Sequence, residues 1–226
     1  MSVEQWARDL NREVFEKWKS TLPDDKQGFK VFSSPVHENP EILLAGTNPG
    51  SKKDADLPRE HMEQFHNGNF SLPSQHEFLV NDWGIATAFR EGLFGGNNTY
   101  LKETVATNRL FLHRGEEDDV NETELEEFNN FCEEKFLEIV ERLSPELVLC
   151  FAQDTYDCLE QKYEFNKLKS EPRAHPTVST KNLLWVSDNE SPQVMWIAHP
   201  SSSHFHGIED TEWETIREEV YPRVNL

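Results

Sequence analysis

The sequence is poor in cysteine, in long hydrophobic runs and in positive charge, and each shortage excludes a class of protein. Cys132, Cys150 and Cys158 form no CxxC pair, so neither a zinc site nor an iron–sulfur cluster is indicated. An odd number of scattered thiols suits a reducing compartment. No apolar run reaches the ~18 residues of a membrane span, and the chain does not open on a signal-peptide pattern. We therefore expect a soluble, cytoplasmic protein without a membrane partner.

Positive charge is scarce, since 22 Lys and Arg stand against 42 Asp and Glu, for a net charge of −20. Proteins that bind nucleic acid through bulk charge carry the opposite balance. The acids are segregated, however. Residues 116–141 hold twelve acids and one base, and residues 209–219 hold six acids and one base. Because Glu suits helices, we expect two solvated acidic helix faces and a remainder of the chain that is close to neutral.

Hydrophobic periodicity predicts strands alternating with helices in a single domain, residues 1–226. Expected helices are 3–19, 58–66, 84–93, 122–143, 153–162 and 211–219. Expected strands are 41–46, 103–108, 146–152, 182–187 and 193–198, with a short edge strand at 29–32. Residues 51–83 and 163–182 are expected to be polar loops, the first containing the helix at 58–66. This order predicts a three-layer α/β/α fold with a mostly parallel sheet and helices on both faces.

Polar motifs follow three of the expected strands. Asn48 lies in GTNPGS at 46–51, Asn108 ends the run ETVATN, and His199 opens HPSSSH at 199–204. In parallel sheets ligands bind beyond the carboxyl ends of the strands, so we expect these three side chains at one edge. Pro49 pushes the residue before it out of the helical region, which restricts Asn48. Taken singly, each motif is also compatible with an ordinary turn or a structural histidine.

The order GxNPG, then Asn, then HPS resembles the uracil-DNA glycosylase superfamily over about residues 40–205, nearest its mismatch-specific and single-strand-selective branches. The resemblance implies a central four-stranded sheet and a metal-independent DNA glycosylase that needs no cofactor and acts as a monomer. It implies that Asn48 positions the hydrolytic water, that Asn108 reads the pyrimidine edge and that His199 supports the departing base. It assigns substrate contacts to Gly46, Thr47, Pro49, Gly50, Phe70 and Asn108. It assigns DNA contacts to Ser51, Lys52, Lys53, Ser201, Ser202, Ser203 and His204.

The residue types suit this chemistry. An amide cannot act as a strong base, but it can orient water for a dissociative cleavage. A neutral His199 can donate a hydrogen bond as charge builds on the base. The Asn108 amide pairs with uracil, or with cytosine after a flip, so it selects a pyrimidine. Gly50 stands where the uracil-selective members carry an aromatic ring, which predicts room for a 5-substituent. Stacking of the flipped base is expected from Phe65, Phe70 or Phe89, with Phe70 preferred.

Other interpretations remain open. The protein could excise a hypermodified phage cytosine in anti-phage defence. It could be a catalytically inactive member of the fold that binds nucleic acid or protein, which the net charge favours. It could be a metal hydrolase built from His199, His204, His206 and Asp210, although that spacing matches no common zinc pattern. Bases near the motifs favour a mildly basic catalytic face; they are Lys52, Lys53, Lys102, Arg109, Arg114 and Arg173, with His175.

Overall fold

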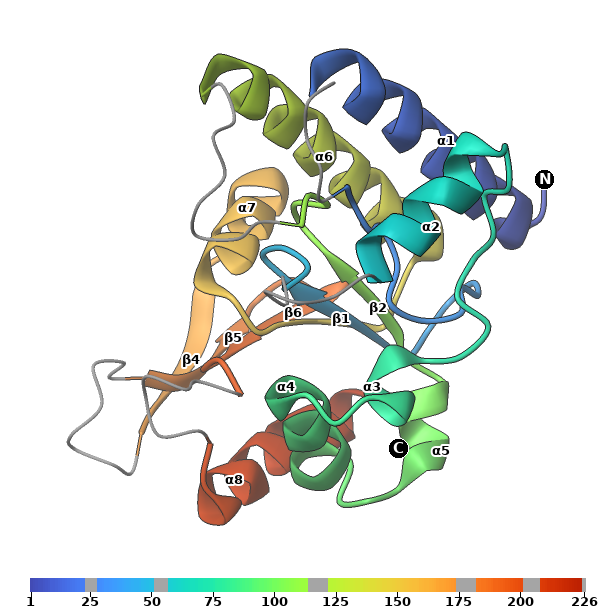
Figure 1. The fold of residues 1–226 in the computed structure, drawn as a ribbon. Coiled ribbons are helices and arrows are strands. Elements are labelled where there is room, and N and C mark those ends of the chain that lie inside the picture. The colour runs from blue at the N-terminus through green and yellow to red at the C-terminus, as the bar shows by residue number, and fades with distance from the viewer. Residues whose placement is uncertain (23–27, 51–56, 114–121, 174–181, 201–207, 225–226) are drawn as a thin grey trace.

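The computed structural model describes residues 1–22, 28–50, 57–113, 122–173, 182–200 and 208–224, and the structural statements below concern these ranges (Figure 1). Among them, no helix has the length and apolar character needed to cross a bilayer.

One six-stranded sheet forms the centre of the molecule (Figure 1). Its strands are β1 (Ile42–Gly46), β2 (Val105–Asn108), β3 (Leu147–Cys150), β4 (Lys167–Pro172), β5 (Asn182–Ser187) and β6 (Gln193–Ile197). Their spatial order is β2-β1-β3-β6-β5-β4. The pairs β1–β2, β1–β3 and β3–β6 are parallel, whereas β5 runs antiparallel to β6 and β4 antiparallel to β5. The expectation of a mostly parallel α/β sheet is confirmed.

The expected number of four strands is wrong, because the sheet has six: the antiparallel strands β5 and β4 are added beside the four parallel ones. β5 matches the strand expected at 182–187, but β4 lies inside the segment 163–182, for which the sequence predicts a polar loop. Nearly all side chains of β4 are exposed, and Leu168 is 70% exposed. A strand at the edge of a sheet with no buried face has no hydrophobic alternation, so periodicity cannot detect it.

Helices cover both faces of the sheet. They are α1 (Val3–Thr21), α2 (Leu57–His66), α3 (Glu77–Val80), α4 (Gly84–Thr87), the π-helix η1 (Ala88–Leu93), α5 (Asn98–Lys102), α6 (Glu122–Leu143), α7 (Gln153–Tyr163), α8 (Asp210–Val220) and the short 3₁₀-helix η2 (Tyr221–Arg223). Apolar residues of α1, α2, α6 and α7 form one core cluster with the sheet. Those of α3, α4, η1, α5 and α8 form a second cluster on the opposite face. The helices expected at 3–19, 58–66, 122–143, 153–162 and 211–219 are confirmed, with shifts of at most two residues at their ends. The helix expected at 84–93 is divided into α4 and the π-helix η1, and the short helices α3 and α5 were not expected.

Strand alternation divides the two clusters. In β1, Leu43 and Ala45 face the α1–α6–α7 side, while Ile42 and Leu44 face the side of η1 and α8. This period of two is the normal geometry of a strand. The same alternation determines toward which face of the sheet the side chain at the end of each strand points.

The β2 edge is covered by the preceding chain. Phe29 and Phe32 form isolated antiparallel bridges with Leu112 and Thr107, and the Ser33 amide donates to the Ala106 carbonyl at 2.9 Å. The edge strand expected at 29–32 is thus reduced to single bridges. At the other edge, β4 carries Lys167, Lys169 and Pro172, which discourage pairing with another strand.

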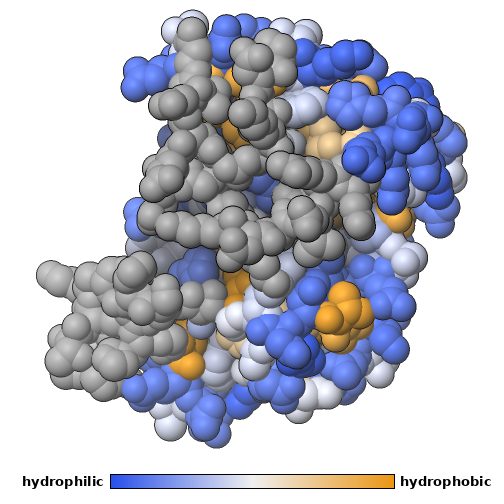
Figure 2. Space-filling model, in the orientation of Figure 1, coloured by the Kyte–Doolittle hydropathy of each residue, from blue (hydrophilic) through white to orange (hydrophobic). Residues whose placement is uncertain are grey.

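The described parts of the two acidic segments form α6 and α8, on opposite faces of the sheet. α6 packs beside α1, and α8 packs on η1 (Figure 1). Most of their acids are exposed, but Glu212 in the first turn of α8 is only 2% exposed. Outside the grey residues, Figure 2 shows a largely hydrophilic surface with small, separated hydrophobic groups.

Candidate functional site

The carboxyl ends of four parallel strands meet at one edge of the sheet. Gly46, the last residue of β1, pairs with Asn108, the last residue of β2. In the next strands Ala45 pairs with Cys150 and Cys150 with Trp196, so Phe151 follows at the level of Gly46. His199 lies two residues beyond β6. The structure therefore places the sequence-predicted Asn108 and His199 at the same edge as the loop that carries Asn48.

Gly46, Asn108 and Phe151 are packed so closely that only glycine fits at position 46. An ideal Cβ there would lie 2.5 Å from Cε2 of Phe151 and 2.7 Å from Oδ1 of Asn108. Contacts this short do not occur for real Cβ atoms, so an alanine would displace the ring or the amide. The absence of a Cβ on Gly46 thus lets the β1 backbone pack directly against the side chains of Phe151 and Asn108.

Asn108 is 7% exposed, and its side chain makes no hydrogen bond within the described part of the chain. An amide that is this little exposed and makes no hydrogen bond to the described residues has its donors and acceptor available for a ligand. Such groups are found where a ligand supplies the missing partners. Asn108 is therefore the strongest candidate for a recognition residue in this structure.

Asn48 lies in the partly buried turn after β1. Its Nδ2 donates weakly to the Pro49 carbonyl at 3.4 Å, and no other hydrogen bond of the side chain is seen among the described residues. The amide oxygen remains available to accept from a water molecule or ligand. Pro49 is buried, which fixes the turn beneath it.

His199 borders the same region through its ring. The ring lies edge-on to Phe151, with centroids 6.1 Å apart and planes at 70°. Desolvation of the ring lowers the pKa of His199 below its usual value, although the residue as a whole is exposed. A lowered pKa keeps the imidazole neutral at neutral pH, the state in which it can donate one hydrogen bond without a full charge.

Phe151 connects these groups and was missed by sequence reasoning. Its ring contacts the position of a Cβ on Gly46, packs against His199 and meets the ring of Phe89 at 5.4 Å. A Phe at the end of an apolar strand looks like a core residue. The signal available was its place: Phe151 directly follows a parallel strand, as do the other candidates.

The remaining predicted substrate contacts divide into two groups. Thr47 and Gly50 are in the loop after β1. The Thr47 hydroxyl donates to Asp154 at 2.7 Å, and no described atom lies within 4 Å of an ideal Cβ on Gly50. Phe70 belongs to a different neighbourhood. Its ring packs with Phe15 and Phe65, at centroid distances of 5.8 and 5.2 Å.

Of the three phenylalanines proposed to stack a base, Phe89 contacts Phe151 at the carboxyl ends of the strands, whereas Phe65 and Phe70 pack together beside Phe15. Phe65 and Phe89 are 1% and 0% exposed and belong to the two cores. The predicted DNA contacts lie outside the described residues; they are Ser51, Lys52, Lys53, Ser201, Ser202, Ser203 and His204.

Two arginines expected to contribute positive charge are neutralised by carboxylates. Arg109 is paired with Glu133 and with Asp154. Arg173 is paired with Glu212 at 2.8 Å, and both side chains are almost fully buried. Lys102 ends α5, just before β2 begins, so it lies toward the amino ends of the parallel strands, whereas Asn108 lies at their carboxyl ends. These three residues do not supply a basic rim, and Lys52, Lys53, Arg114 and His175 lie outside the described residues.

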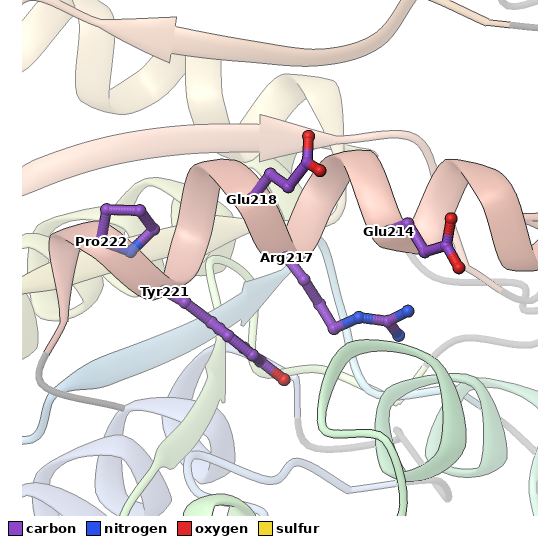
Figure 3. Close-up of a pocket in the computed structure, with 5 residues that line it drawn as sticks. All are labelled: Glu214, Arg217, Glu218, Tyr221 and Pro222. Carbon is purple, nitrogen blue, oxygen red and sulfur yellow. The ribbon is translucent and has the colours of Figure 1, made fainter.

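A surface depression lies away from these groups, along α8 (Figure 3). It is lined by Glu214, Arg217, Glu218, Tyr221 and Pro222. Arg217 donates to the Gly92 carbonyl, and the Tyr221 hydroxyl donates to the Leu93 carbonyl at 2.6 Å. Both side chains thus satisfy carbonyls at the end of η1. No residue of the candidate site lines this depression.

Within the ranges that the structure describes, no group of three or more His, Cys, Asp or Glu side chains is arranged to hold a metal ion. His204 and His206 of the metal-hydrolase interpretation lie outside those ranges. In comparisons with known proteins, no protein-family model and no curated protein sequence matches this chain.

Proposed function

We propose that this protein is a DNA glycosylase that hydrolyses the N-glycosidic bond of a flipped-out pyrimidine. The proposal depends on the buried Asn108 side chain, whose amide makes no hydrogen bond to the described residues. This amide lies close to Gly46 and Phe151. Asn48 and His199 lie at the same carboxyl ends of the strands. A pyrimidine edge offers the donor and acceptor that this amide lacks.

The roles of the three groups follow from their chemistry. Asn108 binds the base edge, and the Asn48 amide oxygen accepts from the water that attacks the sugar. As the bond breaks, positive charge develops on the sugar and negative charge on the base. His199, neutral because its pKa is lowered, donates a hydrogen bond to the base as that charge grows. Each donor of this kind contributes on the order of 10²–10³ in rate.

The test is a panel of labelled oligonucleotides, single- and double-stranded, that contain uracil, a thymine mismatch, 5-hydroxymethylcytosine or a glucosylated cytosine. Abasic sites are revealed by alkaline strand cleavage. Asn48→Ala, Asn108→Ala and His199→Ala should each lower the rate about 10²–10³-fold. The matched control is Asn130→Ala, because Asn130 is exposed on α6. A wild-type protein that cleaves no member of the panel would argue against the proposal.

No atom of the described residues lies within 4 Å of an ideal Cβ on Gly50, which favours a base with a 5-substituent, including the hypermodified cytosines of phage DNA. Preference for the glucosylated or hydroxymethylated substrate would support a defence role. Preference for uracil alone would exclude it.

A second candidate is a binding protein without catalysis. It is favoured by the pairing of Arg109 and Arg173 with carboxylates, which removes two cations from any phosphate contact. Because the loss of these cations weakens phosphate binding, it favours a protein partner over nucleic acid. Folded wild-type protein that neither binds the oligonucleotides nor releases a base would support this candidate.

A further inference from the structure

Asp154, in the first turn of α7, holds the segments that carry both candidate amides. Its Oδ1 accepts from the Thr47 hydroxyl at 2.7 Å and from the Thr155 amide at 2.9 Å. Its Oδ2 accepts from Nη2 of Arg109 at 2.9 Å. Thr47 directly precedes Asn48, and Arg109 directly follows Asn108. One carboxylate is therefore bonded to the chain neighbours of both amides.

Further hydrogen bonds to backbone carbonyls join the same three segments, namely the loops after β1 and β2 and the start of α7. The Arg109 and Leu110 amides donate to the carbonyls of Gly46 and Thr47 at 2.8 and 2.7 Å. The Thr155 hydroxyl donates to the same Gly46 carbonyl at 2.9 Å. The loop after β1, the loop after β2 and the start of α7 are thus joined where strand pairing ends.

Strand alternation explains how the Asp154 carboxylate can hold the neighbours of both amides without lying in the candidate site itself. Asn108 continues the side of Ala106, which faces η1 and α8, whereas Arg109 reaches Glu133 of α6 on the opposite side. Adjacent residues of an extended chain point to opposite faces. The hydrogen bonds of Asp154 with Thr47 and Arg109 therefore lie toward the α6 face of the sheet, whereas Asn108 continues the opposite face. They determine where the two amides lie and leave the polar atoms of those amides available.

We propose that Asp154 is a positioning residue that fixes Asn48 relative to Asn108 through Thr47 and Arg109. This inference rests on the proposed glycosylase function. Catalytic geometry is sensitive to small displacements, since a shift of about 1 Å can lower a rate about 10²-fold. The turn at Asn48 extends beyond the last paired residue of β1, so it depends on the Thr47–Asp154 bond more than the strand does.

The sharpest test changes Thr47, because Thr47→Val removes the hydroxyl while keeping the shape, and Thr47→Ser keeps the hydroxyl. For the preferred oligonucleotide, we expect Thr47→Val to lower kcat about 10–100-fold with KM changed less than about threefold. Thr47→Ser should recover most of the lost rate. Adding Thr47→Val to Asp154→Ala should lower kcat no further, since the bond is already absent.

Thr215→Val, on α8, is the matched control for the loss of a threonine hydroxyl. A purely structural role would lower the thermal midpoint of Thr47→Val without a change in kcat per folded molecule. That result, or equal losses in Thr47→Val and Thr47→Ser, would overturn the proposal.

A second measurement separates this inference from the glycosylase function. The side-chain ¹⁵N–¹H signals of Asn48 and Asn108 can be followed by NMR without any substrate. Thr47→Val should shift the Asn48 signals, and Thr47→Ser should leave them near their original positions. Unchanged Asn48 signals in Thr47→Val would refute the positioning role even in an active enzyme. An inactive wild type with shifted signals would instead reject the glycosylase function alone.

Discussion

His76 provides the clearest prediction of how stability depends on pH. The residue is 2% exposed and precedes α3, where its Nδ1 accepts from the Phe78 amide at 3.2 Å. Its Nε2 lies 3.1 Å from the hydroxyl of Thr104, which in turn donates to the Leu101 carbonyl at 2.9 Å. The hydroxyl hydrogen is thus committed, so Nε2 carries the proton and donates. Both ring nitrogens are satisfied only in the neutral form.

Protonation would add a hydrogen to Nδ1, where the Phe78 amide already points its own. Burial adds a desolvation penalty for the charged ring and lowers the pKa of His76 from 6.5 to about 4. Above pH 6.5 the ring is neutral in both the folded and the unfolded chain. As pH falls below 6.5 the unfolded chain takes up a proton that the folded chain refuses, so stability falls until about pH 4. The difference corresponds to about 3 kcal/mol.

The assay is urea unfolding of wild type and His76→Gln at pH 7.5 and pH 4.5. Glutamine keeps an N–H donor for Thr104 but does not titrate. Other groups contribute to the pH dependence of both proteins, so the informative quantity is the difference between them. Wild type should lose about 2–3 kcal/mol more than the variant over this interval. Parallel losses in the two proteins would show that His76 is not held neutral by the fold.

Three further substitutions test packing and buried charge by the same unfolding measurement. Gly46→Ala should destabilise the protein by about 1–3 kcal/mol and lower any glycosylase rate about 10²-fold, because its Cβ has no room. Gly92→Ala should also cost about 1–3 kcal/mol, since its Cβ would lie 2.2 Å from the ring of Trp213. Glu212→Gln should cost about 3–5 kcal/mol, because it removes the negative charge that pairs with the buried Arg173 side chain.

Gly50→Ala is the matched control for the two glycine substitutions, since no described atom lies near its Cβ. Its unfolding free energy should stay within about 0.5 kcal/mol of wild type. For the ion pair, Arg173→Met combined with Glu212→Leu should recover much of the stability lost in Glu212→Gln. A double variant less stable than the single one would show that the pair does more than neutralise its own charges.

The sequence was sufficient to predict β1, β3 and β6, because a strand buried on both faces appears as a continuous apolar run. The buried strand β2 gives a weaker signal, because Thr107 and Asn108 are polar. The sequence also predicted the long helix α6, whose apolar residues repeat at helical spacing. It could not predict β4, which is exposed and polar.

For the site, Asn108 and His199 were predictable because each one ends or follows an expected strand. The pairing of Arg109 with Asp154 joins residues 45 positions apart, and that of Arg173 with Glu212 joins residues 39 apart. No local pattern encodes such contacts, so these arginines resembled free bases. Phe151 was missed for a different reason, since its hydrophobic character matches the core as well as the site.

The order of strands also has a consequence for folding kinetics. β4, β5 and β6 follow one another along the chain and pair in that order, so their ladders close with short separations. β1 instead pairs with β2 and β3, which lie far downstream. Closing such distant contacts is slow, because loop entropy must be lost first. We therefore expect hydrogen exchange during refolding to protect β5 and β6 before β1, so the edge that carries Asn48 and Asn108 is completed late.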